Sequence, residues 1–183
     1  MITITHIRKI LGQFCGDRRG VSAVEFALLA PLMITLYVGC AEVSDGVGAD
    51  RKVSLTAAAL ANLSAQVTTI STSDMTNILD ASSAIIAPYS TNQLTVTLSC
   101  ISIDASSKAT VMWSVTRGGT AHSGTITIPA ALAVPNSQLL FGEATYQYTP
   151  TVGYTVTGTL NLADHMYMAP RITAPTYNNT TCT

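Results

Sequence analysis

The longest apolar run of the chain spans residues 21–41 and contains one charged residue, Glu25. At about 1.5 Å per residue, an α-helix of this length reaches roughly 30 Å, the thickness of a bilayer's hydrocarbon core. Four basic residues precede the run within the first 20 positions, and such residues favour the cytoplasmic side of a membrane. The pattern predicts a basic leader over residues 1–20, a transmembrane helix over 21–41 and a translocated remainder. A buried core helix is the alternative, but core helices rarely follow a basic flank.

The helical pattern continues beyond this run as a narrow stripe. Apolar and small residues recur there at two heptad positions, which are Val53, Leu60 and Val67, and Thr56, Leu63 and Ile70. The spacing predicts one helix from Val21 to about Gln66. The stripe can pack either on the protein's own head or between subunits.

A second, shorter helix is predicted after residue 71. Ser73 is a good N-cap, and Asp74 suits the positive end of the helix dipole. Pro88 ends the segment, because proline cannot continue a helix. Residues 42–90 are therefore expected to form a helical stem and a short amphipathic helix.

From Gln93 the apolar period changes to two, which indicates β-strands. The alternation slips by one residue between Cys100 and Ile101, which predicts a β-bulge. Further strands are expected after a turn at residues 104–108, at Val111–Val115, Ile126–Ile128, Leu140–Tyr148 and Tyr154–Leu162. Residues 169–183 show no periodicity. The predicted fold class is α+β, with a long N-terminal transmembrane and stem helix followed by a small antiparallel β-rich extracytoplasmic head over residues 91–183.

The low content of charged residues excludes two classes of protein. Charged residues make up 10% of the 183 residues, against about 25% in typical soluble proteins, and the formal net charge is −1. A disordered chain needs more charge, and a nucleic-acid-binding protein needs a basic surface. We therefore expect a folded protein with no nucleic-acid partner.

Residues 19–28, RGVSAVEFAL, resemble the N-terminal signature of the TadE-like pseudopilins of the tight-adherence (Tad, Flp-type) pilus system. The resemblance implies a pilin-like stem and head, and a basic leader that a membrane-embedded prepilin peptidase removes after a glycine. Gly20 would then be the last leader residue and Val21 the new N-terminus, with Glu25 and Phe26 at the fifth and sixth mature positions. The implied partners are the prepilin peptidase, other Tad pilins, the inner-membrane assembly platform and the lipid bilayer.

The position of Glu25 also has a physical rationale. After cleavage, its carboxylate lies one helical turn from the α-ammonium of Val21 and can neutralise that group or the ammonium of a neighbouring subunit. In a dry filament core such a pair favours one axial register, because other registers leave charges unpaired. Inserting the carboxylate into a bilayer costs roughly 2.5–3.5 kcal/mol, so it should have a purpose. Pro31, which follows the signature, should kink or loosen the turn before it.

The resemblance extends more weakly into the head, at residues 109–114, 128–129, 143–150 and 168–171. The roles expected there are structural. Trp113, Tyr146 and Tyr148 have the bulk to fill a small core, and Glu143 could pair with Arg171.

The cysteines give two further expectations. Cys100 and Cys182 lie in the predicted head, in an oxidising bacterial compartment, and either form a disulfide or remain two free thiols. A disulfide would tie the C-terminal tail to the sheet, whereas Cys15 would be lost with the leader. Residues 38–40, Val-Gly-Cys, resemble the end of a lipobox, although Tyr37 stands where that pattern expects leucine.

Residues that carry chemistry are sparse. His6, His122 and His165 lack metal-type spacing to Cys, Asp or Glu, and no nucleotide-binding or nucleophile-elbow motif occurs. We therefore expect no enzyme activity, cofactor, metal or small-molecule substrate. The expected function is that of a minor pilin or pseudopilin in Tad pilus assembly and surface adhesion, in the bacterial inner membrane with a cytoplasmic N-terminus and a periplasmic head, or in a pilus at the cell surface. The alternative is a lipoprotein or a single-pass surface-binding module.

Overall fold

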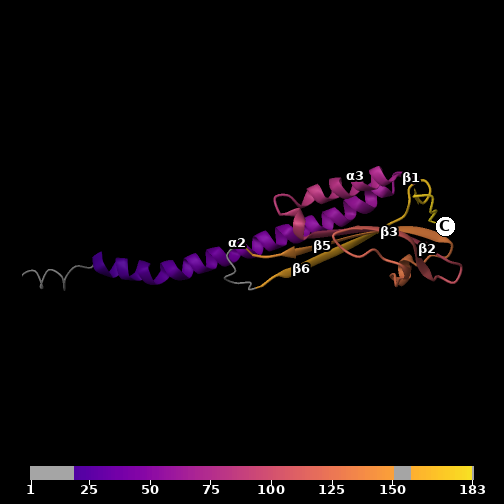
Figure 1. The fold of residues 1–183 in the computed structure, drawn as a ribbon. Coiled ribbons are helices and arrows are strands. Elements are labelled where there is room, and N and C mark those ends of the chain that lie inside the picture. Colours follow the sequence, from indigo (N-terminus) through magenta and orange to yellow (C-terminus); the bar gives the residue numbers. More distant parts are fainter. Residues whose placement is uncertain (1–18, 151–157, 183) are drawn as a thin grey trace, which may run out of the picture.

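The computed structural model describes residues 19–150 and 158–182, and it shows a long N-terminal helix followed by a β-rich head (Figure 1). Helix α2 (Arg19–Ser64) has 46 residues. Its N-terminal part stands clear of the head, and its C-terminal part lies along the sheet (Figure 1). The predicted α+β class, with its pilin-like arrangement of helix and head, is confirmed. Residues 1–18 of the predicted leader, which include Cys15, lie outside the described residues.

The head is built on an antiparallel sheet of five strands in the order β4-β3-β2-β5-β6. The strands are β2 (Leu94–Ile103), β3 (Ala109–Arg117), β4 (Gly124–Thr125), β5 (Ser137–Tyr148) and β6 (Leu160–Met168). The register of β2 against β3 shifts between Cys100 and Ile101, so the predicted bulge is confirmed. Asp104 closes the turn after β2 by accepting hydrogen bonds from the backbone N–H groups of Ser106 and Lys108.

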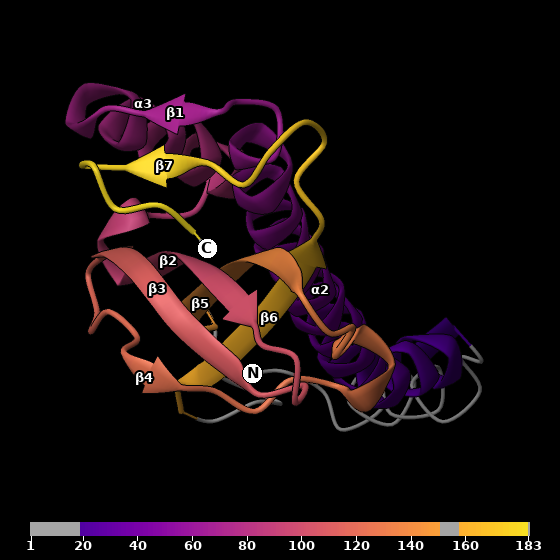
Figure 2. The same ribbon diagram turned by 90° about the vertical axis from the view of Figure 1, so that its right-hand side faces the viewer.

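Two apolar clusters lie on the two faces of this sheet. The main core fills the space between the sheet and the helices (Figure 2) and includes Val53, Leu60, Leu98, Ile86 and Met75. The predicted core aromatics Trp113, Tyr146 and Tyr148 are buried in it. The outer cluster, on the other face, consists of Ile101, Ile103, Ala109, Leu139 and Phe141. Alternation along β5 places neighbouring residues in different clusters.

Two strand predictions are wrong in position. Residues 126–128 form no strand, because their two isoleucines pack on the outer cluster from a loop, and only Gly124–Thr125 pairs with β3. The prediction Tyr154–Leu162 falls partly on residues 151–157, which lie outside the described residues. The strand that pairs with β5 is Leu160–Met168, a register that packs Leu162 and Met168 on the main core.

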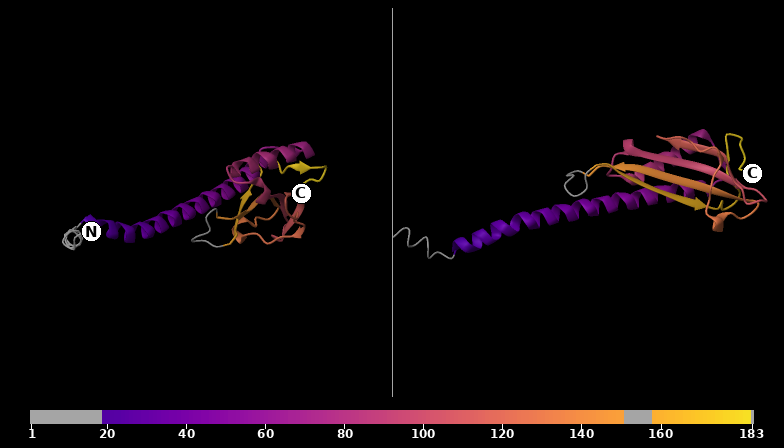
Figure 3. Two further views of the ribbon diagram at one scale, coloured as in Figure 1. Left: turned by 60° about the vertical axis from the view of Figure 1, so that its left-hand side comes forward. Right: turned by 90° about the horizontal axis from the view of Figure 1, so that it is seen from below.

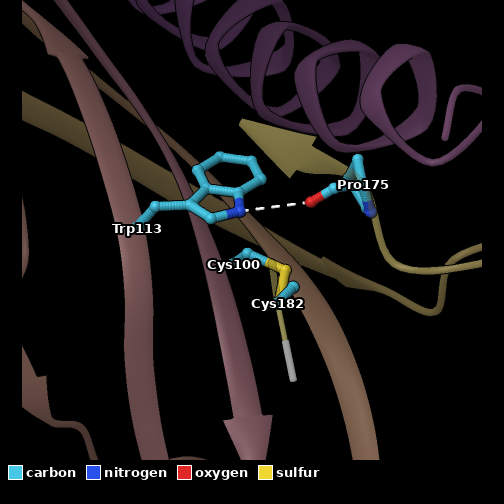
Figure 4. Close-up of a disulfide and its surroundings, with 4 residues drawn as sticks. All are labelled: Cys100, Trp113, Pro175 and Cys182. Atoms are coloured by element: carbon cyan, nitrogen blue, oxygen red, sulfur yellow. Dashed lines mark hydrogen bonds between the residues drawn. A yellow bond between two sulfur atoms is a disulfide. The ribbon is translucent and has the colours of Figure 1, made fainter. Parts of the chain in front are cut away.

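The C-terminal tail is more ordered than its lack of periodicity predicts. Within it, β7 (Thr176–Tyr177) pairs in parallel with β1 (Thr69–Ile70), which follows α2. Cys100 and Cys182 form a disulfide, with Cα atoms 6.0 Å apart and a sequence separation of 82. Beside the disulfide, Trp113 Nε1 donates a hydrogen bond of 3.2 Å to the carbonyl of Pro175 (Figure 4). Partners distant in sequence therefore hold the tail on the sheet.

The buried face of α2 differs from the predicted heptad stripe. Its buried apolar residues are Ala49, Val53, Ala57, Leu60 and Ala61. Leu63 is instead 37% exposed, and the helix ends at Ser64, before Val67. An α-helix repeats every 3.6 residues, so a heptad series drifts away from a face that packs on a sheet. The face packs on the protein's own head, which decides between the two alternatives for this stripe.

Helix α3 (Thr72–Ser83) begins after residue 71, as predicted, but its N-cap lies two residues before the predicted one. Its N-cap is Ser71 rather than Ser73, because Ser71 and Asp74 form a reciprocal capping box. Ser71 Oγ accepts a bond of 3.2 Å from the Asp74 N–H, and Asp74 Oδ2 accepts one of 3.1 Å from the Ser71 N–H. Ser71 Oγ also donates a bond of 2.6 Å to Asp74 Oδ2, and this bond, followed by the one from the Ser71 N–H, lowers the pKa of the Asp74 carboxyl. The segment ends before Pro88, as predicted, and the short 3-10 turns are η1 (Ala84–Ile86), η2 (Thr91–Gln93) and η3 (Ala130–Leu132).

Candidate membrane and assembly segment

The N-terminal part of α2 stands clear of the head (Figure 3), and nearly all of its apolar side chains are exposed. Phe26, Leu28 and Tyr37 are 73%, 73% and 77% exposed. Soluble surfaces rarely carry a contiguous apolar patch of this extent, whereas about 20 apolar residues in a helix suffice to cross a bilayer. Within the described residues, α2 is the one helix with the length and composition to do so, and its most apolar stretch is wholly unburied. The length and composition of α2 thus indicate a membrane-anchored protein with a single span in its described part.

The residues predicted for processing and assembly lie on this open stretch. Val21 is 56% exposed, and a Cβ added at Gly20 would meet no atom within 4 Å. The peptide bond between Gly20 and Val21 lies within α2. Glu25 and Phe26 are exposed, and Glu25 lies four residues after Val21 on the same helix face. The helix thus places Val21, the predicted mature N-terminus, one turn from the Glu25 carboxylate and far from the disulfide.

Pro31 does not interrupt the helix. Proline has no N–H to donate to the preceding turn, so one helical hydrogen bond is missing there. The structure nevertheless continues as one α-helix from Arg19 to Ser64, which bows gently along its length (Figure 1). Thr35, which lies one turn after Pro31, donates a hydrogen bond of 2.8 Å from its Oγ1 to the Pro31 carbonyl oxygen. The loosening predicted at Pro31 is therefore limited to a gentle curvature of α2, and the helix is not broken there.

Three residues, which we call the junction clamp, fasten α2 to the head where the helix leaves the predicted span. The carboxylate of Asp45 accepts bonds of 2.8 Å from the hydroxyls of Tyr89 and Tyr148. Burial, and then the bond to Asp45, raise the pKa of both tyrosines to about 12. The tyrosines lie 44 and 103 residues from Asp45 in sequence, and no local pattern indicated that they contact it.

The sheet approaches α2 most closely at Gly142 in β5. A Cβ at this position would lie 2.7 Å from the carbonyl oxygen of Ala57 and 3.1 Å from the amide nitrogen of Ala61. Real Cβ atoms essentially never come so close to backbone atoms. Glycine is therefore required for the strand and helix to pack at this distance, a role that the sequence pattern alone did not indicate.

The outer face of the sheet carries an ion pair that sequence reasoning missed. His122, in the loop before β4, pairs through Nε2 with the carboxylate of Glu143 in β5. Its backbone N–H also donates a bond of 3.0 Å to Ser114 Oγ. The predicted pair of Glu143 with Arg171 is wrong, because Glu143 points to the outer face. Arg171 donates instead to Asn62 Oδ1, at 2.7 Å, near the end of α2.

Residues 20–61 match the family model described as TadE-like protein. The N-terminal helix is TadE-like. The match begins at Gly20, the predicted last leader residue, and ends at Ala61, where α2 is buried against the sheet. The TadE-like resemblance is therefore confirmed over the helix, and the head segments that resemble the family lie outside the match. No curated protein and no solved structure matches the chain.

Metal-binding groups do not gather around the TadE-like helix or elsewhere in the described residues. No set of three or more His, Cys, Asp or Glu side chains is placed there to hold a metal ion. His122 and His165 instead contact the ring of Phe141, with centroid distances of 6.0 and 5.7 Å. These contacts give both histidines a packing role on the outer face.

Proposed function

We propose that this protein is a minor pilin or pseudopilin that a prepilin peptidase cleaves after Gly20 and that then joins, or helps to initiate, a Tad pilus used for surface adhesion. The TadE-like helix supports a Tad pilus-associated, pilin-like protein. The observation that carries the proposal is that the family match begins at residue 20, the predicted last leader residue, and covers the exposed apolar stretch of α2. Other components of the pilus are accordingly its partners.

The proposed mechanism uses the helix in two states. In the bilayer, the exposed apolar side chains of residues 21–41 face acyl chains. In the filament they face the same segments of neighbouring subunits, and Glu25 pairs with a Val21 ammonium to set the axial register. The N-terminus is cytoplasmic before cleavage, and the head lies on the periplasmic side of the inner membrane. The protein is a substrate and a structural subunit in this scheme, without catalysis of its own.

Mass spectrometry of the mature protein from cells that carry the prepilin peptidase tests the cleavage. We expect an N-terminal peptide that starts at Val21, and retention of residues 1–20 in cells that lack the peptidase. An intact Met1 in both strains would contradict the proposal. A lipid on Cys40, which lies exposed in the middle of α2, would instead support the lipoprotein alternative.

A matched pair of variants tests the register function of Glu25. Glu25→Gln removes the charge at constant size, and Ser22→Ala changes a neighbouring exposed position in the same turn. We expect both variants to insert into the membrane, and only Glu25→Gln to lose assembly into sheared pili. Normal piliation with Glu25→Gln would refute the register function and leave the cleavage result standing.

A further inference from the structure

A groove of about 280 Å³, which we call the α3–β3 groove, lies on the head between helix α3 and the C-terminal end of strand β3. One of its walls is a single face of α3, which carries Thr72, Met75, Thr76 and Leu79. The opposite wall is the stretch of β3 from Val115 to Arg117. Met75 and Leu79 are 2% and 7% exposed, so the groove has an apolar floor that is part of the main core.

The β3 wall of the groove is an open edge of the sheet. On the side away from β2, strand β3 pairs with β4 at Thr110 and Val111 alone. Beyond Val111, none of the described residues hydrogen-bonds to the backbone of β3 on that side. The pairing with β2 continues to Arg117. Because the bonding directions alternate along a strand, the stretch 112–117 presents backbone N–H and C=O groups that have no strand partner.

The loop that follows β3 leaves this edge uncovered. In the loop, His122 pairs with Glu143 of β5, and β2 lies between β3 and β5 in the sheet. A Cβ at Gly119 would lie 2.7 Å from the Thr95 side chain on β2. The loop therefore crosses the outer face of the sheet toward β2 and β5, and none of residues 118–123 lines the α3–β3 groove.

Three properties of the groove select its occupant. The unpaired backbone groups of β3 match an extended chain, which carries N–H and C=O groups along its own edge. A second copy of the chain that paired through the same edge would bring its own α3 to the space that α3 already occupies. The charged residues that line the groove, Arg117 and Asp80, pair with each other. The groove thus has no net charge and favours an uncharged segment.

We propose that the head binds an extended, uncharged segment of another protein chain by antiparallel strand addition to β3. The backbone of the segment pairs with the open edge over residues 112–117. One of its apolar side chains enters the α3–β3 groove toward Met75 and Leu79, and an uncharged residue lies beside Arg117 and Asp80. The site lies on the head, so this inference goes beyond the proposed pilus function and is independent of cleavage at Gly20.

Fluorescence anisotropy of the full-length protein in detergent micelles tests the site. The probe is a fluorescein-labelled peptide amide with the sequence Thr-Val-Thr-Leu-Thr-Val-Thr. Two further peptides carry N-methyl groups, one on its threonines and the other on its valines and leucine. Successive N–H groups of an extended chain point to opposite edges, so each of these peptides keeps the donors of one edge only.

A matched pair of variants locates the bound peptide. Thr76→Phe places a ring in the groove from an exposed position of α3, and Asn77→Phe places the same ring at the next exposed position, which does not line the groove. We expect the wild type and Asn77→Phe to bind the probe equally. Thr76→Phe should bind it about tenfold more weakly, because the ring takes the space of the leucine side chain. Near-ultraviolet circular dichroism checks that both variants are folded.

The peptides test the mode of binding. We expect only one of the two N-methylated peptides to bind like the probe, because a single edge of the peptide faces β3. Replacing the terminal threonines of the probe by aspartate or by lysine should not tighten binding. Equal binding of both N-methylated peptides would refute strand addition, and tighter binding of a charged peptide would refute the preference for an uncharged segment.

Four other results would overturn the site. Equal binding of the probe by Thr76→Phe and the wild type would show that the groove is not where the peptide binds. No binding by the wild type at millimolar probe would exclude a peptide site of useful affinity. Binding of maltotetraose that Thr76→Phe abolishes would show that the groove takes a glycan. Wild-type dimers that dissociate in Thr76→Phe would show that a second copy of the chain occupies it.

Discussion

Replacing Gly142 by alanine tests the closest contact between the sheet and α2. The new Cβ would lie 2.7 Å from the Ala57 carbonyl oxygen and 3.1 Å from the Ala61 nitrogen. Both are backbone atoms in a buried part of the helix, so they cannot move aside as the end of a flexible side chain can. We expect the free energy of unfolding to fall by about 1–3 kcal/mol, the usual cost of overpacking a core. The strand and helix must separate slightly, and the neighbouring contacts of the main core weaken with them.

Gly46→Ala is the matched control. Gly46 lies in α2 itself, but its Cβ would meet the Tyr148 ring at 3.7 Å, an ordinary contact. Alanine has a higher helix propensity than glycine, so this variant should gain about 0.5–1 kcal/mol. Both variants replace a glycine by alanine, and they differ in whether the structure has room for the added Cβ atom.

Urea unfolding of the full-length protein in detergent, followed by tryptophan fluorescence, measures both variants. Trp113 is the one tryptophan of the chain and is 7% exposed in the main core, so its emission reports the loss of this packing. The reasoning would be refuted if Gly142→Ala unfolded at the same urea concentration as the wild type while Gly46→Ala showed its expected gain.

Three further predictions follow from the head. Cys182→Ser should lower the free energy of unfolding by about 2–5 kcal/mol through loss of the long disulfide loop, whereas Cys40→Ser should not change it; equal stability of both variants in urea would contradict this. Ser71→Ala should cost about 1 kcal/mol through loss of the α3 cap, seen as faster amide exchange confined to α3, and unchanged exchange would rule the cap out. The pKa of Tyr148 is raised from 10.0 to about 12, so its stabilisation is present below pH 10 and declines as pH rises toward 12; Tyr148→Phe should flatten this decline, and equal slopes in urea unfolding over this window would argue against it.

Local structure followed from patterns between neighbouring residues. An unbroken apolar run over residues 21–41 requires a helix that leaves its side chains open to lipid, because a helix alone satisfies its own backbone in a bilayer. The alternation from Leu94 to Cys100, with its slip before Ile101, was enough to predict both β2 and its bulge. The strand β4 was misplaced because two residues are too few to carry a period, and its position depends on pairing with β3.

The candidate site likewise has one part that the sequence predicted and another part that it did not. Gly20, Val21, Glu25 and Phe26 lie within one short segment, so their type and spacing could be recognised from the sequence. The junction clamp and the close approach at Gly142 join α2 to residues that lie 44 to 103 positions away in sequence. Side chains at such distances meet only when the sheet has formed and packed, and no local periodicity records which of them will do so.

The sequence by itself determined that this chain has an apolar, TadE-like helix and a β-rich head of low charge. The tertiary structure decided how the two are joined. It placed the small residues of α2 against Gly142, set Asp45 between two tyrosines, and paired Glu143 with His122 rather than Arg171. The physical reason is that helix and strand formation depend on neighbours along the chain, whereas packing and pairing depend on which surfaces are brought within a few ångströms of each other.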